Sequence, residues 1–267
     1  MSFSAEWLTL REPYDKRARN VAVLDAVAAA AGARTSIAVV DLACGTGSTL
    51  RALSPRLPKT QSWRLADNDL GLLARAAALA KPPHLTVESV PVDLARDLEV
   101  VLDGPVELVT TSALLDLVSH DWLDRLATEC AARRLPIYAA LTYDGLATPE
   151  PVDPLDSMLI DAVNAHQRTD KGFGPALGPA AAATAPERFE ALGYTVTQGA
   201  SDWVFGPKDV EIQIAVLTGW AVAAREIGTP IDDVIAWLAR RRDHIAAGRS
   251  AVRVGHVDFF AQPTGTR

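Results

Sequence analysis

The sequence has few cysteines and no long uninterrupted apolar run. Only two cysteines, Cys44 and Cys130, occur in 267 residues, so we expect neither a disulfide framework nor a cysteine-based zinc site, and we predict no metal centre. No apolar run reaches membrane-spanning length, and the first residues, MSFSAEWLTLREPYD, lack the apolar core of a signal peptide. The sequence therefore predicts a cytoplasmic protein that does not bind membranes.

An excess of positive charge is also missing. The net charge is -7 and the isoelectric point is near 5.3, which gives no electrostatic reason to bind a phosphate backbone. Nucleic acid is therefore not an expected partner. The basic run at residues 240–242 falls near the end of an expected helix, where cations suit the helix dipole and solvent.

The most informative segment is residues 37–50, IAVVDLACGTGSTL. An apolar run leads through Asp41 to a loop that holds Gly45 and Gly47. Because glycine has no Cβ, it lets the backbone turn sharply and approach a ligand, and the next helix offers free N–H groups at its start. The pattern predicts a strand whose carboxyl end meets a small-molecule cofactor.

The spacing of the glycines excludes the usual dinucleotide fingerprint, because its third glycine position holds Leu50. The acidic Asp41, the small Ala43 and the two glycines instead resemble motif I of class I S-adenosylmethionine-dependent methyltransferases. The resemblance implies that the glycine loop packs along the amino-acid portion of S-adenosylmethionine. It also implies that Asp41 orders the loop and receives the cofactor's ammonium group.

A second acidic strand end follows at residues 62–67, SWRLAD. Asp67 stands 20 residues beyond Gly47, the position from which an acid binds the ribose hydroxyls in nucleotide folds. Asn68 beside it is a further cofactor-binding candidate. Asn68 or Asp69 could cap a helix expected over residues 70–80, and capping alone is the other interpretation of Asp67.

Residues 85–92, LTVESVPV, alternate like a third strand and lead to Asp93 and Leu94. In the family that these residues resemble, an acid here receives the adenine amino group and an apolar neighbour packs on the base. The resemblance therefore assigns Asp93 and Leu94 to adenine. Taken without the other strand ends, Asp93 would be a solvated turn residue.

Residues 107–118, ELVTTSALLDLV, predict a central strand that ends near Ser112, a cofactor-binding candidate, with a helix from about 119 to 121 onward. The resemblance places the meeting of methyl group and acceptor here. The NPPY or DPPF type of sequence is absent, which argues against nucleic-acid bases and protein glutamine as acceptors. Asp116 is a catalytic candidate to orient or deprotonate the acceptor, unless Asp116 or Ser119 only caps the helix.

The next strand, expected over residues 136–142, delivers Tyr143 to the same sheet edge, as a catalytic candidate or as packing. Residues 145–183 then form an insertion that we expect to be a substrate lid, with a helix near 156–167. The candidate substrate-binding residues are His120 and a cluster formed by His166, Arg168 and Lys171. The cluster could hold an acceptor carboxylate or phosphate, or be a solvated helix end.

The remaining chain fits the end of such a sheet. We expect a helix over 186–192, a strand over 194–205, two helices within 208–248 and a final strand over 251–260. The resemblance makes the last two strands an antiparallel pair. The expected fold class is thus α/β, a single domain over 1–267 with a doubly wound, mostly parallel seven-stranded sheet and helical insertions. The apolar helix positions within 208–248 are expected to be core or homodimer contacts.

The segment over 7–20 precedes the first strand, and in the resembled family such a segment often folds over the cofactor. Arg11 and Tyr14 are therefore candidates to bind the methionine carboxylate, because a guanidinium matches a carboxylate in bidentate fashion. A plain capped helix beginning near Pro13 is the alternative interpretation.

These features predict methyl transfer from S-adenosylmethionine to an O or N atom of a small polar or anionic metabolite, with S-adenosylhomocysteine as product. The transfer is an in-line displacement, and the cofactor already carries the activation. A base is needed only for a protonated acceptor, and Asp116, His120, Tyr143 and His166 remain open for that role. Two alternatives are a non-catalytic sensor of S-adenosylmethionine and a nucleotide-dependent oxidoreductase.

Overall fold

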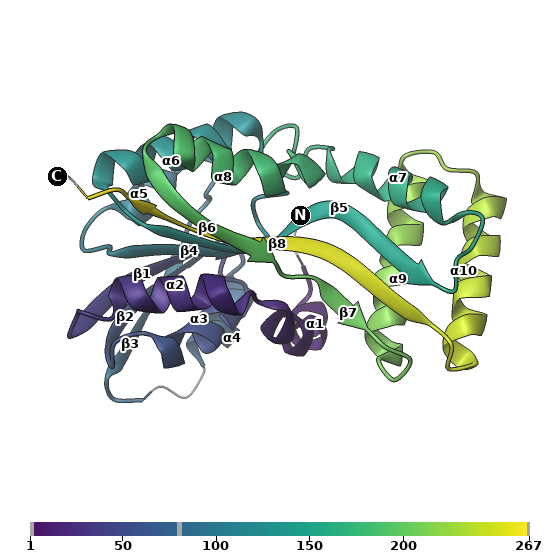
Figure 1. Cartoon of the computed structure of the whole chain (residues 1–267), viewed down its shortest axis with the longest axis horizontal. Coiled ribbons are helices and arrows are strands. Elements are labelled where there is room, and N and C mark those ends of the chain that lie inside the picture. The colour runs from purple at the N-terminus through teal and green to yellow at the C-terminus, as the bar shows by residue number, and fades with distance from the viewer. Residues whose placement is uncertain (1–2, 79–81, 266–267) are drawn as a thin grey trace.

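The computed structural model describes residues 3–78 and 82–265, and it contains one twisted, mixed sheet (Figure 1). The strand order is β3-β2-β1-β4-β5-β8-β6, with β7 paired to β8. Strands β1 to β5 run parallel, and β8 is antiparallel to β5, β6 and β7. The strands are β1 (Ser36–Leu42), β2 (Thr60–Asp67), β3 (Leu85–Pro91), β4 (Leu108–Ser112), β5 (Ile137–Glu150), β6 (Tyr194–Ala200), β7 (Trp203–Phe205) and β8 (Ala251–Pro263). The mostly parallel α/β sheet is confirmed, with an eighth short strand.

Helices cover both faces of the parallel part, because its strands are apolar on both sides. Val39 points to the core under one face and Val40 to the core under the other. In Figure 1 one set of these helices lies below the sheet and another set lies above it. The lower set is α2 (Val21–Ala31), α3 (Ser48–Leu53) and α4 (Leu70–Ala77), and the upper set is α5 (Leu98–Leu102), α6 (His120–Arg133) and α8 (Ala181–Ala191).

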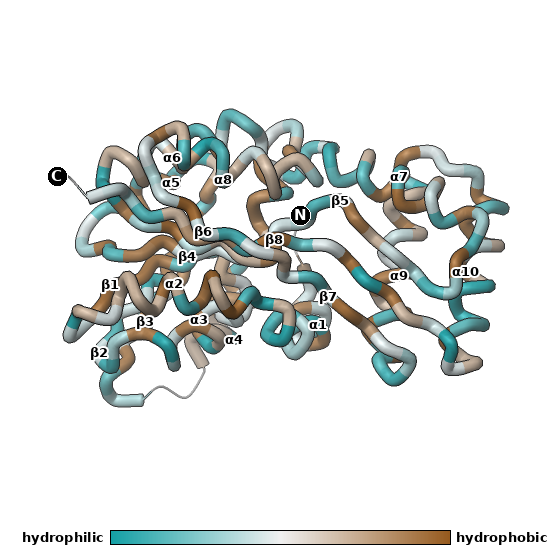
Figure 2. Tube along the Cα trace, viewed as in Figure 1, coloured by the Kyte–Doolittle hydropathy of each residue, from teal (hydrophilic) through white to brown (hydrophobic). Residues whose placement is uncertain are grey.

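Strands β5 and β8 continue beyond the parallel sheet as a long antiparallel ribbon that β7 joins (Figure 1, right). Three helices pack together with the ribbon, namely α7 (Asp156–Gln167), α9 (Val210–Glu226) and α10 (Ile231–Ala246). A separate apolar core with Leu159, Phe205 and Trp237 lies between these helices and the strands. Figure 2 shows the hydrophobic residues recurring along the strands and along α9.

A buried ion pair joins α7 to α10 in this region. The Arg241 side chain is fully buried and bonds to the carboxylate of Asp156 and the carbonyl of Pro151. The other Asp156 oxygen accepts a hydrogen bond of 2.8 Å from the indole nitrogen of Trp237. One carboxylate therefore holds two side chains of α10.

Two strand predictions were wrong in extent. The strand expected to end before Tyr143 continues to Glu150, so residues 145–150 are part of β5 rather than the start of an insertion. The strand expected over 194–205 is two strands, because Asp202 turns inward to accept from the backbone of His256 and to pair with Arg253. As a result, β6 pairs with the C-terminal part of β8 and β7 pairs with its N-terminal part.

Two helix predictions began too late. Helix α8 starts at Ala181 rather than at Pro186, because the alanines before the proline favour helix and extend α8 toward its N-terminus. The first helix, α1 (Ala5–Ala18), starts at the N-cap Ser4 and not near Pro13, and the Ser4 hydroxyl accepts from the backbone of Trp7.

The helices expected over 120–134, 156–167 and within 208–248 are confirmed. Helix α4 ends at Ala77, and the end expected at residue 80 falls outside the described residues. Across residues 3–78 and 82–265, none of the helices combines the length and apolar character that crossing a bilayer requires.

Candidate active site

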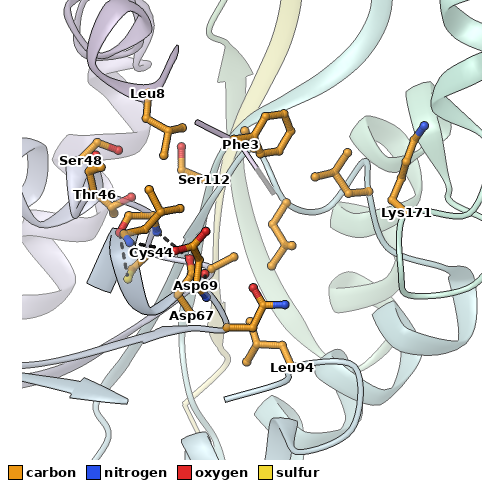
Figure 3. A pocket seen from close by; sticks show the side chains of 18 of the residues that line it. Phe3, Leu8, Cys44, Thr46, Ser48, Asp67, Asp69, Leu94, Ser112 and Lys171 are labelled. Carbon is orange, nitrogen blue, oxygen red and sulfur yellow. Dashed lines mark hydrogen bonds between the residues drawn. The ribbon is translucent and has the colours of Figure 1, made fainter. Parts of the chain in front are cut away.

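A cavity of about 190 Å³, here called the strand-end cavity, opens where β1, β2 and β4 end (Figure 3). Asp67, Cys44 and Thr46 lie on one side of it, and Phe3 and Lys171 lie on the other. The wall therefore combines strand ends with the N-terminal segment and with the loop after α7. This position, at the carboxyl edge of a parallel sheet, is where α/β folds bind their ligands.

The glycine loop forms one wall of the strand-end cavity. Gly45 has φ 53°, and a Cβ there would stand 3.2 Å from the Leu8 side chain. Gly47 has φ 80° and is the N-cap of α3, where its N–H donates to the Cys44 carbonyl at 2.8 Å. Gly45 lines the cavity but Gly47 does not. Gly47 therefore makes the turn, and its predicted cofactor contact is not supported.

Asp67 holds the loop in place. Its Oδ2 accepts from the Gly45 N–H at 2.8 Å, and its Oδ1 accepts from the Asp69 N–H at 3.0 Å. Asp69 in turn caps α4 by accepting from Gly71 and Leu72. Asp67 is thus not a helix cap, and it performs the loop-ordering task that was predicted for Asp41.

Asp41 is fully buried and does not line the strand-end cavity. It stands opposite Thr110 in the register of β1 and β4, and its Oδ1 accepts from the Thr110 hydroxyl at 2.7 Å. Its Oδ2 has no partner among the described residues. Burial raises the pKa of Asp41 to about 7. The expected loop contact of Asp41 is therefore wrong, because the side chain points into the sheet.

The remaining cofactor candidates line the strand-end cavity as expected. Asn68, Asp93, Leu94 and Ser112 are all in its wall, and so is Ala43. The loop after β3 is fixed from both sides. The Asp93 carboxylate accepts from the Ala95 N–H at 3.0 Å, and the Leu94 carbonyl accepts from the Trp122 indole at 2.7 Å.

A second cavity of about 470 Å³, here called the aromatic cavity, lies between α1, α7, α9 and the β5–β7–β8 ribbon. Rings of Trp7, Tyr143, Trp203 and Trp220 line it. Helix α9 adds a row of small residues at a spacing of four, Ala215, Gly219 and Ala223. The helical insertion predicted as core or dimer surface therefore forms a wall of a cavity.

The two cavities adjoin. Phe3, Arg11, Ala113 and Leu117 line both of them. Arg11 is buried, its Nε donates to Asp15 at 2.9 Å, and its guanidinium lies 5.1 Å from the centre of the Trp203 ring. Tyr14, the other candidate from α1, instead donates to Asp209 at 3.0 Å and lines neither cavity.

Asp116 lies in the wall of the aromatic cavity and is only 5% exposed. Its Oδ2 accepts from the Gln167 amide at 3.4 Å, and its Oδ1 has no partner among the described residues. Burial raises the pKa of Asp116 to about 6. Ser119, not Asp116, caps α6 by accepting from the Trp122 N–H at 3.2 Å.

The other predicted proton acceptors are placed differently. The Tyr143 ring lines the aromatic cavity, but its hydroxyl donates to Asn164 at 2.8 Å, and burial raises the pKa of Tyr143 further above neutrality. The His120 side chain is 63% exposed beside Asp124 and lines neither cavity, because it starts α6 on the outer face. The substrate role of His120 therefore stays a prediction that neither cavity supports.

The predicted cation cluster is only partly assembled. The Lys171 Nζ lies 3.3 Å from His166 Nδ1, and His166 Nε2 lies 2.8 Å from the carboxylate of Glu226. Burial lowers the pKa of Lys171. Lys171 lines the strand-end cavity and His166 the aromatic cavity. Arg168 follows the last residue of α7, donates back to the Asn164 carbonyl at 3.1 Å and lines neither cavity, so its substrate role stays a prediction.

Three residues with left-handed backbone line the cavities, and one of them, Ala113, lines both. Ala43, Ala113 and Leu141 have φ values of 52°, 52° and 55°, and each lines a cavity. Such strain in residues with a Cβ gathers where the surrounding structure fixes a functional geometry. The sequence carried no signal for this strain.

His256 was missed by sequence reasoning, because a single histidine in a strand has no distinctive pattern. It lines the aromatic cavity and is 6% exposed, and its ring centre lies 4.8 Å from that of Trp203. Its Nδ1 lies 3.1 Å from the Val254 carbonyl. Burial lowers the pKa of His256 to about 3.

Comparison with known proteins relates part of this chain to methyltransferases. Residues 39–135 match the family model described as a methyltransferase domain, whereas no curated protein matches the sequence. The YcgJ protein from Bacillus subtilis shares 14% identity, with 92% of this chain and 100% of that chain covered at a TM-score of 0.51. A cyclopropane-fatty-acyl-phospholipid synthase-like protein from Lactobacillus casei also shares 14% identity, with 94% and 98% covered at a TM-score of 0.50.

The two solved structures establish a shared fold, and the family match covers the glycine loop, the Asp67 strand end and the Asp93 strand end. Residues 39–135 therefore match a methyltransferase domain.

Proposed function

We propose that the chain methylates an O or N atom of a small acceptor that binds in the aromatic cavity, with S-adenosylmethionine in the strand-end cavity. The observation that carries this proposal is the junction of the two cavities. They share the walls formed by Arg11, Ala113 and Leu117, and Asp116 brings an unpartnered carboxylate oxygen to the second cavity. Donor and acceptor molecules would thus meet beside one buried base.

The strand-end cavity fits S-adenosylmethionine in its residue types. The backbone around Gly45 and Thr46 would face the amino-acid portion, with Arg11 toward its carboxylate. Asp67 and Asn68 would face the ribose, and the Asp93–Leu94 pair the adenine. When bound, the cofactor supplies a methyl group on a positively charged sulfur and leaves as S-adenosylhomocysteine.

A lid role for residues 151–183, the part of the predicted insertion that follows β5, is also part of the proposal. Lys171 and Phe173 of this segment lie in the wall of the strand-end cavity, and the Phe173 ring packs edge-on against Trp122 at 5.3 Å. Gly172 between them has φ 106°, which glycine adopts without strain. These contacts support a segment that covers the cofactor.

Asp116 would accept the proton that the acceptor loses. Because burial raises its pKa to about 6, Asp116 is mostly a carboxylate at neutral pH and still basic enough to take a proton. The walls of the two cavities would hold the acceptor atom in line with the methyl group, and this alignment is the main catalytic contribution of the protein.

The acceptor that fits best has an apolar body with a hydroxyl or amine. Trp7, Trp203 and Trp220 line the aromatic cavity, and the predicted cluster of three cations is not formed there. An anionic group would also face the Asp116 carboxylate. We therefore favour an uncharged acceptor over the anionic metabolite that the sequence suggested.

The replacement Asp67→Asn is expected to weaken S-adenosylhomocysteine binding about 10-fold or more, because it removes a charged acceptor from Gly45 and from the ribose. Calorimetric titration with S-adenosylmethionine, S-adenosylhomocysteine and NAD measures this directly. The matched control is Asp25→Asn, an exposed carboxylate on α2 that pairs with Arg56. Binding of NAD without S-adenosylhomocysteine would contradict the proposed function, and cofactor binding without turnover would favour a sensor.

A further inference from the structure

We propose that the acceptor is a flat aromatic molecule with two hydrogen-bond donors, one of which donates to Asp116 and the other to His256. The proposal rests on the proposed function, because it names the substrate class of the aromatic cavity. His256 then acts as a specificity-determining residue for that reaction.

The wall of the aromatic cavity is rich in aromatic side chains. The sequence has six tryptophans, and three of them, Trp7, Trp203 and Trp220, line this one cavity with Tyr143. The Trp7 and Trp203 ring centres are 6.2 Å apart at an interplanar angle of 77°. Aromatic rings prefer offset or edge-to-face contacts with one another. A planar ring therefore gains more in this cavity than a saturated chain of the same size.

A hydrogen bond to the backbone fixes the tautomer of the His256 ring. Its Nδ1 lies 3.1 Å from the Val254 carbonyl, which can only accept, so Nδ1 carries the hydrogen. The ring is buried against Trp203 and Tyr143, at centre distances of 4.8 and 5.9 Å, and burial keeps it neutral. In a neutral imidazole with hydrogen on Nδ1, Nε2 is an acceptor. Nε2 has no partner within the described part of the chain.

The aromatic cavity offers a ligand two acceptors. Asp116 Oδ1 is buried without a partner among residues 3–78 and 82–265, and His256, whose ring makes its only hydrogen bond to those residues at Nδ1, leaves Nε2 as the other acceptor in the wall. A ligand that brings two donors satisfies both of them, whereas a ligand without donors leaves them unpaired at a cost. Arg11 does not favour an anionic acceptor, because its Nε pairs with Asp15 at 2.9 Å and its other N–H groups are the ones proposed for the cofactor carboxylate.

The proposal is tested by calorimetry on the full chain saturated with S-adenosylhomocysteine, which prevents turnover. The probes are 2,3-, 1,5- and 2,7-dihydroxynaphthalene, together with 2-naphthol and decahydronaphthalene-2,3-diol. We expect at least one aromatic diol to bind about 10-fold or more tightly than 2-naphthol and than the saturated diol. In His256→Phe the preference for the second hydroxyl should largely disappear, since phenylalanine keeps the ring and removes the acceptor.

His256→Gln and Trp220→Leu complete the design. Glutamine restores an acceptor and should recover part of the preference, and loss of the Trp220 ring should weaken the aromatic diol but not the saturated one. S-adenosylhomocysteine binding by each variant reports that it is folded. Equal binding of the saturated diol, or an unchanged preference in His256→Phe, overturns this inference while the proposed function stands. Failure of the wild type to bind S-adenosylhomocysteine overturns the proposed function itself.

Discussion

Replacing Asp116 by asparagine is expected to lower kcat by about 10² to 10⁴, the range that general base catalysis contributes. Asparagine keeps the shape and the contact with Gln167 but cannot take a proton. The affinity for S-adenosylhomocysteine should stay within about twofold, because Asp116 lines the aromatic cavity and not the strand-end cavity. The assay is formation of S-adenosylhomocysteine with the tightest-binding aromatic diol.

The pH dependence supplies a second measure of the same role. The pKa of Asp116 is raised to about 6, so the residue is protonated and inactive as a base below this pH and ionised above it. We expect kcat of the wild type to rise through about pH 6 and then level off, and we expect a flat profile in Asp116→Asn. The control Asp161→Asn, an exposed carboxylate on α7, should keep the wild-type rate and profile. A kcat for Asp116→Asn within threefold of the wild type would remove Asp116 as the base.

Replacing Asp156 by alanine is expected to lower the free energy of unfolding by about 3 to 5 kcal/mol, because it leaves a buried guanidinium without its counter-charge. Arg241 is fully buried, and Trp237 loses the acceptor for its indole N–H as well. Denaturant unfolding followed by tryptophan fluorescence gives the value. The control Arg56→Ala, which breaks an exposed pair with Asp25, should cost less than about 1 kcal/mol.

A double replacement separates loss of the charge pair from loss of packing. Asp156→Leu combined with Arg241→Met removes both charges and keeps apolar volume, so it should be more stable than Asp156→Ala. A double variant as unstable as the single one would mean that the Trp237 and backbone contacts of Asp156, and not the unpaired Arg241, carry the cost.

The sequence predicted the cofactor edge well, because its signals are local. A glycine needed for a left-handed turn, as at Gly45, and an acid that ends an apolar strand, as at Asp67 and Asp93, are visible within a few residues. The parallel order of the strands then brings these ends together at one edge. What local pattern could not decide was which acid faces the loop. Asp41 and Asp67 both stand near strand ends, but Asp41 accepts from Thr110 within the sheet, whereas Asp67 accepts from Gly45 in the loop.

The acceptor side could not be predicted in the same way. The aromatic cavity joins Trp7 to Trp203 and Trp220, which are about 200 residues apart in the sequence and meet only through the packing of α1 and α9 on the ribbon. The length of β5 was missed because the pairing that extends it comes from β8, more than 100 residues later. His256 sits on that same strand, so its role depended on a pairing that no local pattern reveals.

The row of small residues on α9 leaves room for larger side chains in the wall of the aromatic cavity. Ala215, Gly219 and Ala223 follow one another at one turn each and set the depth of the aromatic cavity on that side. A Cβ added at Gly219 would meet nothing within 4 Å. Larger side chains on this one helix face can therefore reshape the acceptor space while the glycine loop and Asp116 stay untouched. Under the proposed function, such substitutions would change which acceptor binds without changing the residues proposed to act on it.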